Sequence, residues 1–397
     1  MLSTSLKSPE PAPSRSPSER SAFASAVVFT SRFRWYAHCR VRDHRKQTVV
    51  FYMILLFVHM PAGNPNPPVA VRFLHIAKTA GYSLGEMIHR CRYTPLSLLP
   101  QNYSYGAEFC FRNLMADHLW PSWQQTPGTH VVRMTTLRSP REHVLSQYKQ
   151  CRFGHWNPWV GRSEVGKHQP LFPAGEADGG EYIVGGFRQW LQHFQTWNVS
   201  NGDWHCYHPR SMQARALTCS LGAHTSGHHV LSDESQAIFP DAEQAIANMR
   251  SIEHVGMVDL FYESWCLLLF KVGTRPLPDS CDCTAREEPS GARVQQARGA
   301  HATDELHTNE ATSHTTDDVN SVKVINLPHD VLELIDTLSE ADARLFSAGA
   351  LRVIRELREA ERQTGTSLLC TAALTQFVNA TSYIPNLAKQ LQVFSGT

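Results

Sequence analysis

Residues 69–90 read VAVRFLHIAKTAGYSLGEMIHR. The first part, Val69–Ile76, is rich in β-branched, aliphatic and aromatic residues, which predict a buried strand. Ser83 then suits a helix N-cap, with Glu86 three residues later as its capping-box partner. A strand, a short loop with Lys78 and a helix would aim backbone N–H groups, a helix N-terminus and a full positive charge at one point. The stretch therefore predicts a phosphate- or sulfate-binding loop.

A second strand-to-helix step lies at residues 131–148, which read VVRMTTLRSPREHVLSQY. Its apolar first half predicts another strand, and Ser139-Pro140 is a strong helix start. Arg138 is then expected at the end of that strand, and Ser146 two turns into the helix, on a side that can face the same point. A guanidinium and a hydroxyl so placed can bind one phosphate together.

Both stretches resemble the donor-binding motifs of Golgi carbohydrate sulfotransferases, the group that includes the heparan sulfate 2-O- and 6-O-sulfotransferases. Residues 75–84, HIAKTAGYSL, are similar to the HIxKTGGTS-type loop that binds the 5′-phosphosulfate in that family, with Ala80-Gly81-Tyr82 where the family has Gly-Gly-Thr. Residues 131–148 look like the family's 3′-phosphate-binding segment, with Arg-Ser-Pro in place of Arg-Asp-Pro. The resemblance covers about residues 69–363, the insertion described below excepted, and implies the sulfotransferase variant of the P-loop fold.

The resemblance also implies a donor, 3′-phosphoadenosine 5′-phosphosulfate, and roles for the matching residues. Lys78 and the loop amides would stabilise the leaving phosphate, and Arg138 and Ser146 would bind the 3′-phosphate. His118, between the two motifs, would take the proton of the acceptor hydroxyl, with Asp117 and His75 as alternatives. No metal is required by this scheme. The expected donor-binding residues are Lys78, Thr79, Ala80, Gly81, Tyr82, Ser83, Arg138 and Ser146.

Two later segments extend the resemblance. Met212–Leu217 is similar to an (N/M)xQTRxL element of related enzymes, so Arg215 is expected either to help hold the nucleotide or acceptor or to form a structural ion pair. Residues 255–259 are similar to a strand-to-helix step near the end of the family's core.

The composition of the 397-residue chain indicates a globular protein. Hydrophobic residues make up 42% of it, which is enough for a sizeable core. The 37 basic and 36 acidic residues nearly cancel, so a net charge of +1 gives no overall attraction to nucleic acid, and none is expected as a partner. Ten cysteines without a CxxC pair or zinc-site spacing argue against a structural metal and permit disulfides. Cys281 and Cys283 cannot easily bridge each other and are expected to pair with Cys206, Cys219 or others.

The N-terminal region predicts membrane targeting. Residues 1–47 are rich in Ser, Pro and Arg and are expected to be disordered and cytoplasmic. Residues 48–60 form an apolar run behind a basic cluster, which favours a signal-anchor over a cleaved targeting sequence or an internal strand, and residues 61–68 would be a short stem. With three Asn-x-Ser/Thr sequons at Asn102, Asn198 and Asn379, this pattern favours a single-pass type II protein of the Golgi membrane with its catalytic domain in the lumen.

The rest of the chain alternates strand and helix patterns. We expect a domain over 69–363 with an α/β, P-loop-like sulfotransferase fold, in which helices flank a mainly parallel sheet. Within it, 150–180 is expected to be a loop whose Trp and basic residues either line an acceptor groove or pack on the domain, and 274–319 a disordered insertion. The tail, 364–397, has no assigned structure. Helices are expected over 187–197, 242–250, 262–272, 330–338 and 340–363, and a late strand over 252–260.

The function expected from these motifs is sulfuryl transfer to a hydroxyl of a carbohydrate or glycoconjugate. A tyrosine or a small alcohol remains an alternative acceptor. A P-loop kinase is the first rival, although the chain lacks a Walker-type Lys-Ser/Thr and a metal-holding Asp in the expected context. The second rival is a Golgi membrane protein that binds nucleotide or glycan without turnover.

Overall fold

The computed structural model describes residues 69–76, 79, 111–116, 127, 130–153, 179–196, 207, 209–219, 240–285 and 322–395. These residues all belong to one compact unit. The predictions for residues 1–47, 48–60 and 61–68 lie outside them. Within the described ranges, no helix is both long and apolar enough to span a bilayer.

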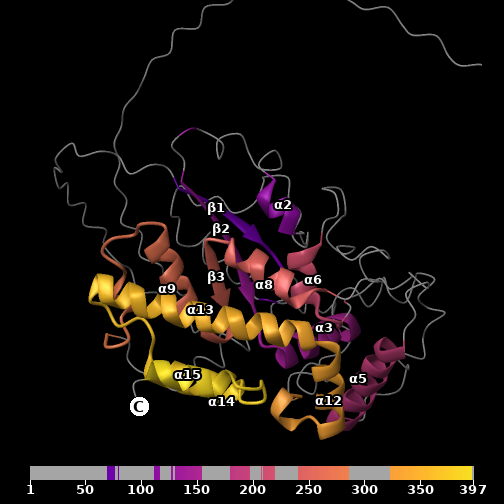
Figure 1. Ribbon diagram of the computed structural model, residues 1–397. Helices are drawn as coiled ribbons and strands as arrows, with labels where there is room; N and C mark the ends of the chain where they lie inside the picture. Colours follow the sequence, from indigo (N-terminus) through magenta and orange to yellow (C-terminus); the bar gives the residue numbers. More distant parts are fainter. Residues whose placement is uncertain are drawn as a thin grey trace, which may run out of the picture. The chain divides into compact units, whose positions relative to one another are not determined.

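Helices separate the described strands along the chain, and only helices follow the last of them (Figure 1). They are β1 (Val69–Leu74), α2 (Phe111–Met115), β2 (His130–Leu137), α3 (Pro140–Phe153), α5 (Gly179–Thr196), α6 (Met212–Thr218), α8 (Ala242–Arg250), β3 (His254–Met257), η5 (Val258–Leu260), α9 (Phe261–Lys271), η6 (Asp279–Cys281), η7 (Val324–Asn326), α12 (His329–Leu338), α13 (Glu340–Thr364), α14 (Thr371–Ala380) and α15 (Leu387–Ser395).

The strands of the described part form one small parallel sheet in the order β1-β2-β3. Val69 lies beside His130 at one end of the β1–β2 register, and Leu137 beside Met257 at the carboxyl end of the β2–β3 register. Because the strands are parallel, their carboxyl ends meet at one edge. The expectation of an α/β fold with a parallel sheet and flanking helices is confirmed at this level.

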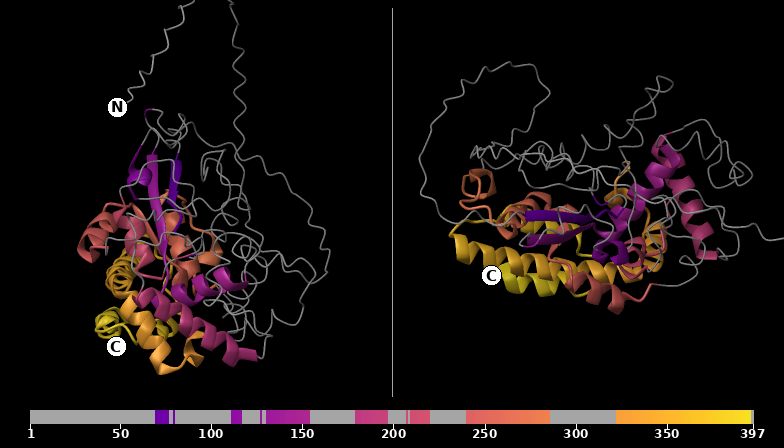
Figure 2. Two further views of the ribbon diagram at one scale, coloured as in Figure 1. Left: turned by 90° about the vertical axis from the view of Figure 1, so that its right-hand side faces the viewer. Right: turned by 90° about the horizontal axis from the view of Figure 1, so that it is seen from above.

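Helices α13 and α9 cover opposite faces of the sheet (Figures 1 and 2). A Cβ added to Gly349 of α13 would lie 2.7 Å from Leu137 of β2, so glycine permits this close approach. A Cβ on Gly256 of β3 would instead meet Thr136 at 3.0 Å and Ser264 of α9 at 3.4 Å. Thr136 and Leu137 are consecutive in a strand and point to opposite faces.

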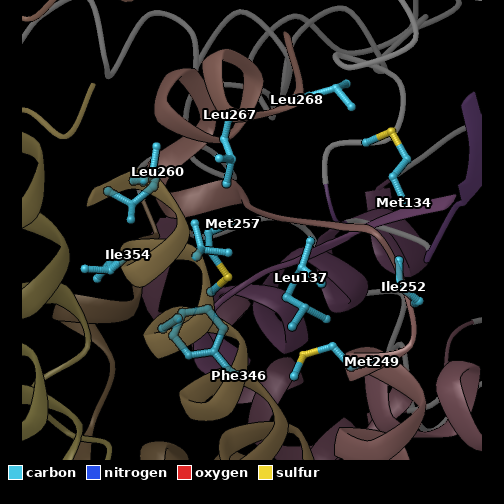
Figure 3. Packing of buried hydrophobic residues seen from close by; sticks show 14 of the residues in the cluster. Met134, Leu137, Met249, Ile252, Met257, Leu260, Leu267, Leu268, Phe346 and Ile354 are labelled. Carbon is cyan, nitrogen blue, oxygen red and sulfur yellow. The ribbon is translucent and has the colours of Figure 1, made fainter. Parts of the chain in front are cut away.

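The apolar core lies between these helices and the sheet. Figure 3 shows Met257 of β3 close to Phe346 of α13, and Leu137 of β2 and Ile354 of α13 belong to the same cluster. A second apolar cluster joins α3, α5 and α12, and it contains Tyr148 together with Phe187, Trp190 and Phe194 of α5. Phe187, Trp190, Leu191 and Phe194, which were predicted from helical spacing to face the core, are each 0% exposed.

Two segments within the expected domain differ from the sequence-based expectations. Helix α5 begins at Gly179, inside the segment that was expected to be a loop to residue 180. Residues 274–285, at the start of the expected disordered insertion, are ordered and held by disulfides Cys266–Cys281 and Cys283–Cys370. Cys219 is also disulfide-bonded.

The C-terminal tail differs as well, because α14 and α15 pack into the main core. Phe377, Leu387 and Leu391 are buried there. The domain therefore extends beyond residue 363, to the end of the described residues.

Candidate functional site

The carboxyl edge of the sheet gathers polar residues from the end of each strand. Thr79 follows β1, Arg138 and Ser139 follow β2, and Asp259 follows β3. Parallel α/β sheets bind their ligands at this edge. We therefore take it as the candidate site.

Thr79 ties the loop after β1 to the central strand. Its hydroxyl donates to the carbonyl of Ile76 (2.7 Å), and the hydroxyl of Thr136 donates to the carbonyl of Thr79 (2.7 Å). The amide of Thr79 also donates to Ile76 (3.3 Å). Thr79, which was predicted to bind the donor, is 0% exposed and shapes the start of the loop.

Arg138 lies directly after the central strand, as the strand and helix-start patterns predicted. Its side chain is 24% exposed and forms an ion pair with Glu142 one helical turn later, at 3.5 Å. Gln213 of α6 holds its main chain with two bonds: Arg138 N–H donates to Gln213 Oε1, and Gln213 Nε2 donates to the Arg138 carbonyl, both at 2.9 Å. Both the N–H and the carbonyl of Arg138 are therefore hydrogen-bonded, which fixes the backbone from which the guanidinium projects.

A buried carboxylate positions Gln213 in turn. Asp342 of α13 accepts the backbone N–H groups of Gln213 (3.3 Å) and Ala214 (2.8 Å) at the start of α6. Burial raises the pKa of Asp342 to about 7, although these amides and the charge of Arg215 act in the opposite direction. Hydrogen bonds therefore connect Asp342 of α13 to the start of α6, and Gln213 of α6 to the backbone of Arg138.

Ser139 joins the ends of two strands. Its amide and hydroxyl donate to the carboxylate of Asp259, at 3.1 and 3.3 Å. The sequence predicted a capping serine here; its carbonyl does accept the N–H of His143 (2.9 Å) as α3 begins, but its hydroxyl bonds to Asp259. Asp259 thereby fixes the turn from which Arg138 projects.

Ser146 and Lys149 lie along α3 on the side of Glu142, since residues four and seven positions apart share a helix face. Lys149 Nζ donates to the carbonyl of Val322 at 2.6 Å. Burial lowers the pKa of Lys149 to about 8, Glu142 raises it, and the cations Arg138 and Lys323 lower it. Arg138 and Lys149 therefore share an electrostatic environment.

Lys149 was missed by the sequence-based reasoning. The available signal was its spacing of three residues from Ser146 and seven from Glu142, which places it on the expected phosphate-facing side of the helix. Arg138, Ser146 and Lys149 lie along one side of α3, and two cations with a hydroxyl are a donor set that suits a phosphate or sulfate group.

Of the other residues predicted for the site, most lie outside the described part of the chain. Lys78, Ala80, Gly81, Tyr82, Ser83, Asp117 and His118 lie outside the described residues. His75 is half-buried and its ring stacks on Phe73, with centroids 5.8 Å apart.

Arg215 is buried, and its Nε donates to the Arg210 carbonyl at 2.7 Å. Burial first, and then Arg210, lowers the pKa of Arg215 to about 10, whereas Asp342 raises it. These surroundings favour the structural alternative for Arg215 over a direct ligand contact.

The fold and this edge define the class only as an α/β protein with a candidate anion site. No family model, no curated protein and no solved structure matches the chain. Among the residues that the structure describes, no three His, Cys, Asp or Glu side chains gather as metal ligands.

Proposed function

We propose that the protein is a sulfotransferase with the P-loop-like fold of that enzyme class, and that it uses 3′-phosphoadenosine 5′-phosphosulfate as donor. The observation that carries the proposal is the placement of Arg138. It follows the central strand, Gln213 fixes its backbone, and it shares an electrostatic environment with Lys149. A 3′-phosphate distinguishes this donor from ATP and AMP, and a fixed guanidinium is the group expected to recognise it.

The reaction needs positioning more than covalent help from the protein, as in phosphoryl transfer. The acceptor oxygen forms a new bond to sulfur while the bond from sulfur to the bridging phosphate oxygen breaks, which releases 3′-phosphoadenosine 5′-phosphate. In the proposal, Lys78 and the amides from Thr79 to Ser83 stabilise the charge that develops on the leaving phosphate. His118 takes the proton of the acceptor hydroxyl.

The described residues fit the donor's phosphate in charge and chemistry. Glu142, the acidic partner of Arg138, has a side chain that is 42% exposed, and their 3.5 Å ion pair is long. Arg138 is partly buried, but a pair this long with a solvent-exposed carboxylate contributes only about 1 kcal/mol. In the proposal, a dianionic phosphate competes with Glu142 for the guanidinium of Arg138.

The proposed acceptor is a hydroxyl of a carbohydrate or glycoconjugate. The proposed location is the Golgi membrane, with residues 48–60 as a single-pass type II anchor and the catalytic domain in the lumen. These parts of the proposal rest on the sequence motifs and the resemblance.

Sulfate transfer tests the proposal directly. The full chain is incubated with donor that carries radioactive sulfate and with a panel of desulfated polysaccharides, and label in the polymer is counted. We expect transfer that His118→Ala reduces roughly 100-fold or more, with donor binding retained. Donor binding without transfer to any acceptor would favour the non-catalytic binding protein, and phosphate transfer from ATP would favour the kinase.

A further inference from the structure

Helix α3 carries a second cation that the proposed donor site has not yet used. Lys149 follows Ser146 by three residues and Glu142 by seven, so all three lie on one side of the helix. Arg138 extends over the first turn of that side, where it pairs with Glu142. Ser146 therefore lies between a guanidinium at one end and an ammonium at the other.

The ammonium of Lys149 is anchored but retains donors. One N–H bond goes to the Val322 carbonyl at 2.6 Å, and an ammonium has three. The anchor comes from a main-chain carbonyl and not from a carboxylate, so the charge of Lys149 is not neutralised by that bond. An anion beside Ser146 can therefore accept a second N–H bond without displacing Val322.

The charged groups around Lys149 have both signs. Glu142 on α3 is an acidic neighbour, whereas Arg138 and Lys323 both oppose its charge. Three described carboxylates on the helices packed against α3 have other partners. On α12, Asp336 pairs with Arg141 and Asp330 with Arg188, and on α13 Asp342 bonds to the amides of α6.

We propose that Lys149 completes the 3′-phosphate site with Arg138 and Ser146, so that the bound phosphate contacts an ammonium, a guanidinium and a hydroxyl. This inference rests on the proposed function, because it assigns a further ligand to the same site. It also predicts a coupled proton. Burial lowers the pKa of Lys149 to about 8, so near pH 8 about half of the protein carries a neutral amine. A bound dianion favours the charged form, and binding then takes up a proton.

The test is calorimetric titration of the full chain at pH 8 with 3′-phosphoadenosine 5′-phosphate and with 5′-AMP, each in two buffers of different ionisation enthalpy. We expect uptake of up to about half a proton with the bisphosphate and none with AMP. The phosphates themselves contribute little, because their second pKa is about 6.

Lys149→Met is expected to weaken the bisphosphate roughly tenfold or more, to abolish the proton uptake and to leave AMP binding unchanged. Lys149→Arg keeps a charge at this position if the Met variant does not fold, and it is expected to retain the affinity but lose the uptake.

Lys271→Met is the matched control. Lys271 is also half-buried and donates to a main-chain carbonyl at 2.6 Å, that of Glu253, but it lies at the opposite edge of the sheet. We expect its substitution to leave the preference for the bisphosphate unchanged.

The possible failures are distinguishable. If the bisphosphate is preferred and needs Arg138, but the Lys149 variants keep both affinity and proton uptake, Lys149 is only an anchor for Val322 and this inference is overturned. If the bisphosphate has no preference over AMP in the unchanged protein, the proposed function fails and this inference fails with it.

Discussion

The basic residues at the two edges of the sheet have different hydrogen-bond partners. At the amino edge, Arg133 donates to Glu253 at 2.7 Å, and Glu356 accepts from Lys271 at 2.6 Å and from Arg352 at 2.8 Å. At the carboxyl edge, Arg138 has a long 3.5 Å pair with Glu142, and Lys149 donates to a carbonyl.

We infer that the cations at one edge stabilise the fold and that those at the other edge bind a ligand. Cations that hold the fold meet carboxylates at short range and leave little affinity for another anion. At the carboxyl edge, Arg138 has a longer contact with its carboxylate and the nearby Lys149 is anchored by a carbonyl, and we propose that these two cations bind an anionic ligand. The following variants test this distinction.

The largest effect is expected at the amino edge, from Arg352→Met. This change leaves the carbonyls of Met249 and Ile252 without their guanidinium donor and removes one cation from Glu356. Because these groups are largely buried, the free energy of unfolding should fall by about 3 kcal/mol, measured by urea denaturation.

Arg344→Met serves as the control on the same helix, because its ion pair with Glu243 is exposed and should contribute about 0–1 kcal/mol. The selectivity of Arg352→Met for the bisphosphate over AMP should be unchanged. A loss of that selectivity would show that the amino edge also supports ligand binding, which would contradict the distinction between the two edges.

The second effect is a pH dependence of stability that originates beneath the carboxyl edge. Burial raises the pKa of Asp342 to about 7, above the value of about 3.9 for an exposed aspartate. Between about pH 4 and 7 the folded state binds more protons than the unfolded state, so this group lowers stability as pH rises, by at most ~1.4 kcal/mol per pH unit.

Asp342→Asn should remove that slope, as measured by urea denaturation at pH 5 and pH 7. An asparagine oxygen can still accept an amide N–H of α6, so the variant should fold. An unchanged slope would mean that Asp342 titrates in its ordinary range and that its carboxylate does not lower the free energy of unfolding as pH rises.

The smallest effect is expected from Gln213→Ala, which removes both bonds to the backbone of Arg138. Affinity for 3′-phosphoadenosine 5′-phosphate should fall about tenfold, roughly 1.4 kcal/mol, while that for 5′-AMP is retained. Calorimetric titration measures both.

Gln147→Ala is the matched control for Gln213→Ala. Gln147 is also 0% exposed, but its side chain contacts His143 and Met212 instead of Arg138. Equal losses in the two variants would indicate general destabilisation, and the positioning role of Gln213 would then be wrong.

Local patterns predicted much of the fold. The apolar runs gave β1 and β2, and the Pro140 start of α3 and the bounds of α8 were also as expected. These features depend on residues that are close in sequence. Periodicity and capping rules use only such residues, so they could predict them.

The features that were not predicted depend on contacts between distant residues. The bond of Gln213 to Arg138 and that of Asp342 to α6 each join residues far apart in the chain. Spacing could place Lys149 on the helix face of Ser146, but its contact with Val322 joins it to a residue much later in the chain. The order of residues 274–285 depends on disulfide partners that the sequence left open.

The central claim is that Arg138 is a ligand of a 3′-phosphate. The most direct measurement is the affinity of the full chain for 3′-phosphoadenosine 5′-phosphate and 5′-AMP, with Arg138→Ala and, as the amino-edge control, Arg133→Ala. We predict a preference for the bisphosphate that Arg138→Ala removes, with roughly 100-fold weaker binding, and that Arg133→Ala keeps. Equal affinities for the two nucleotides, or a preference that survives Arg138→Ala in a folded protein, would contradict the account.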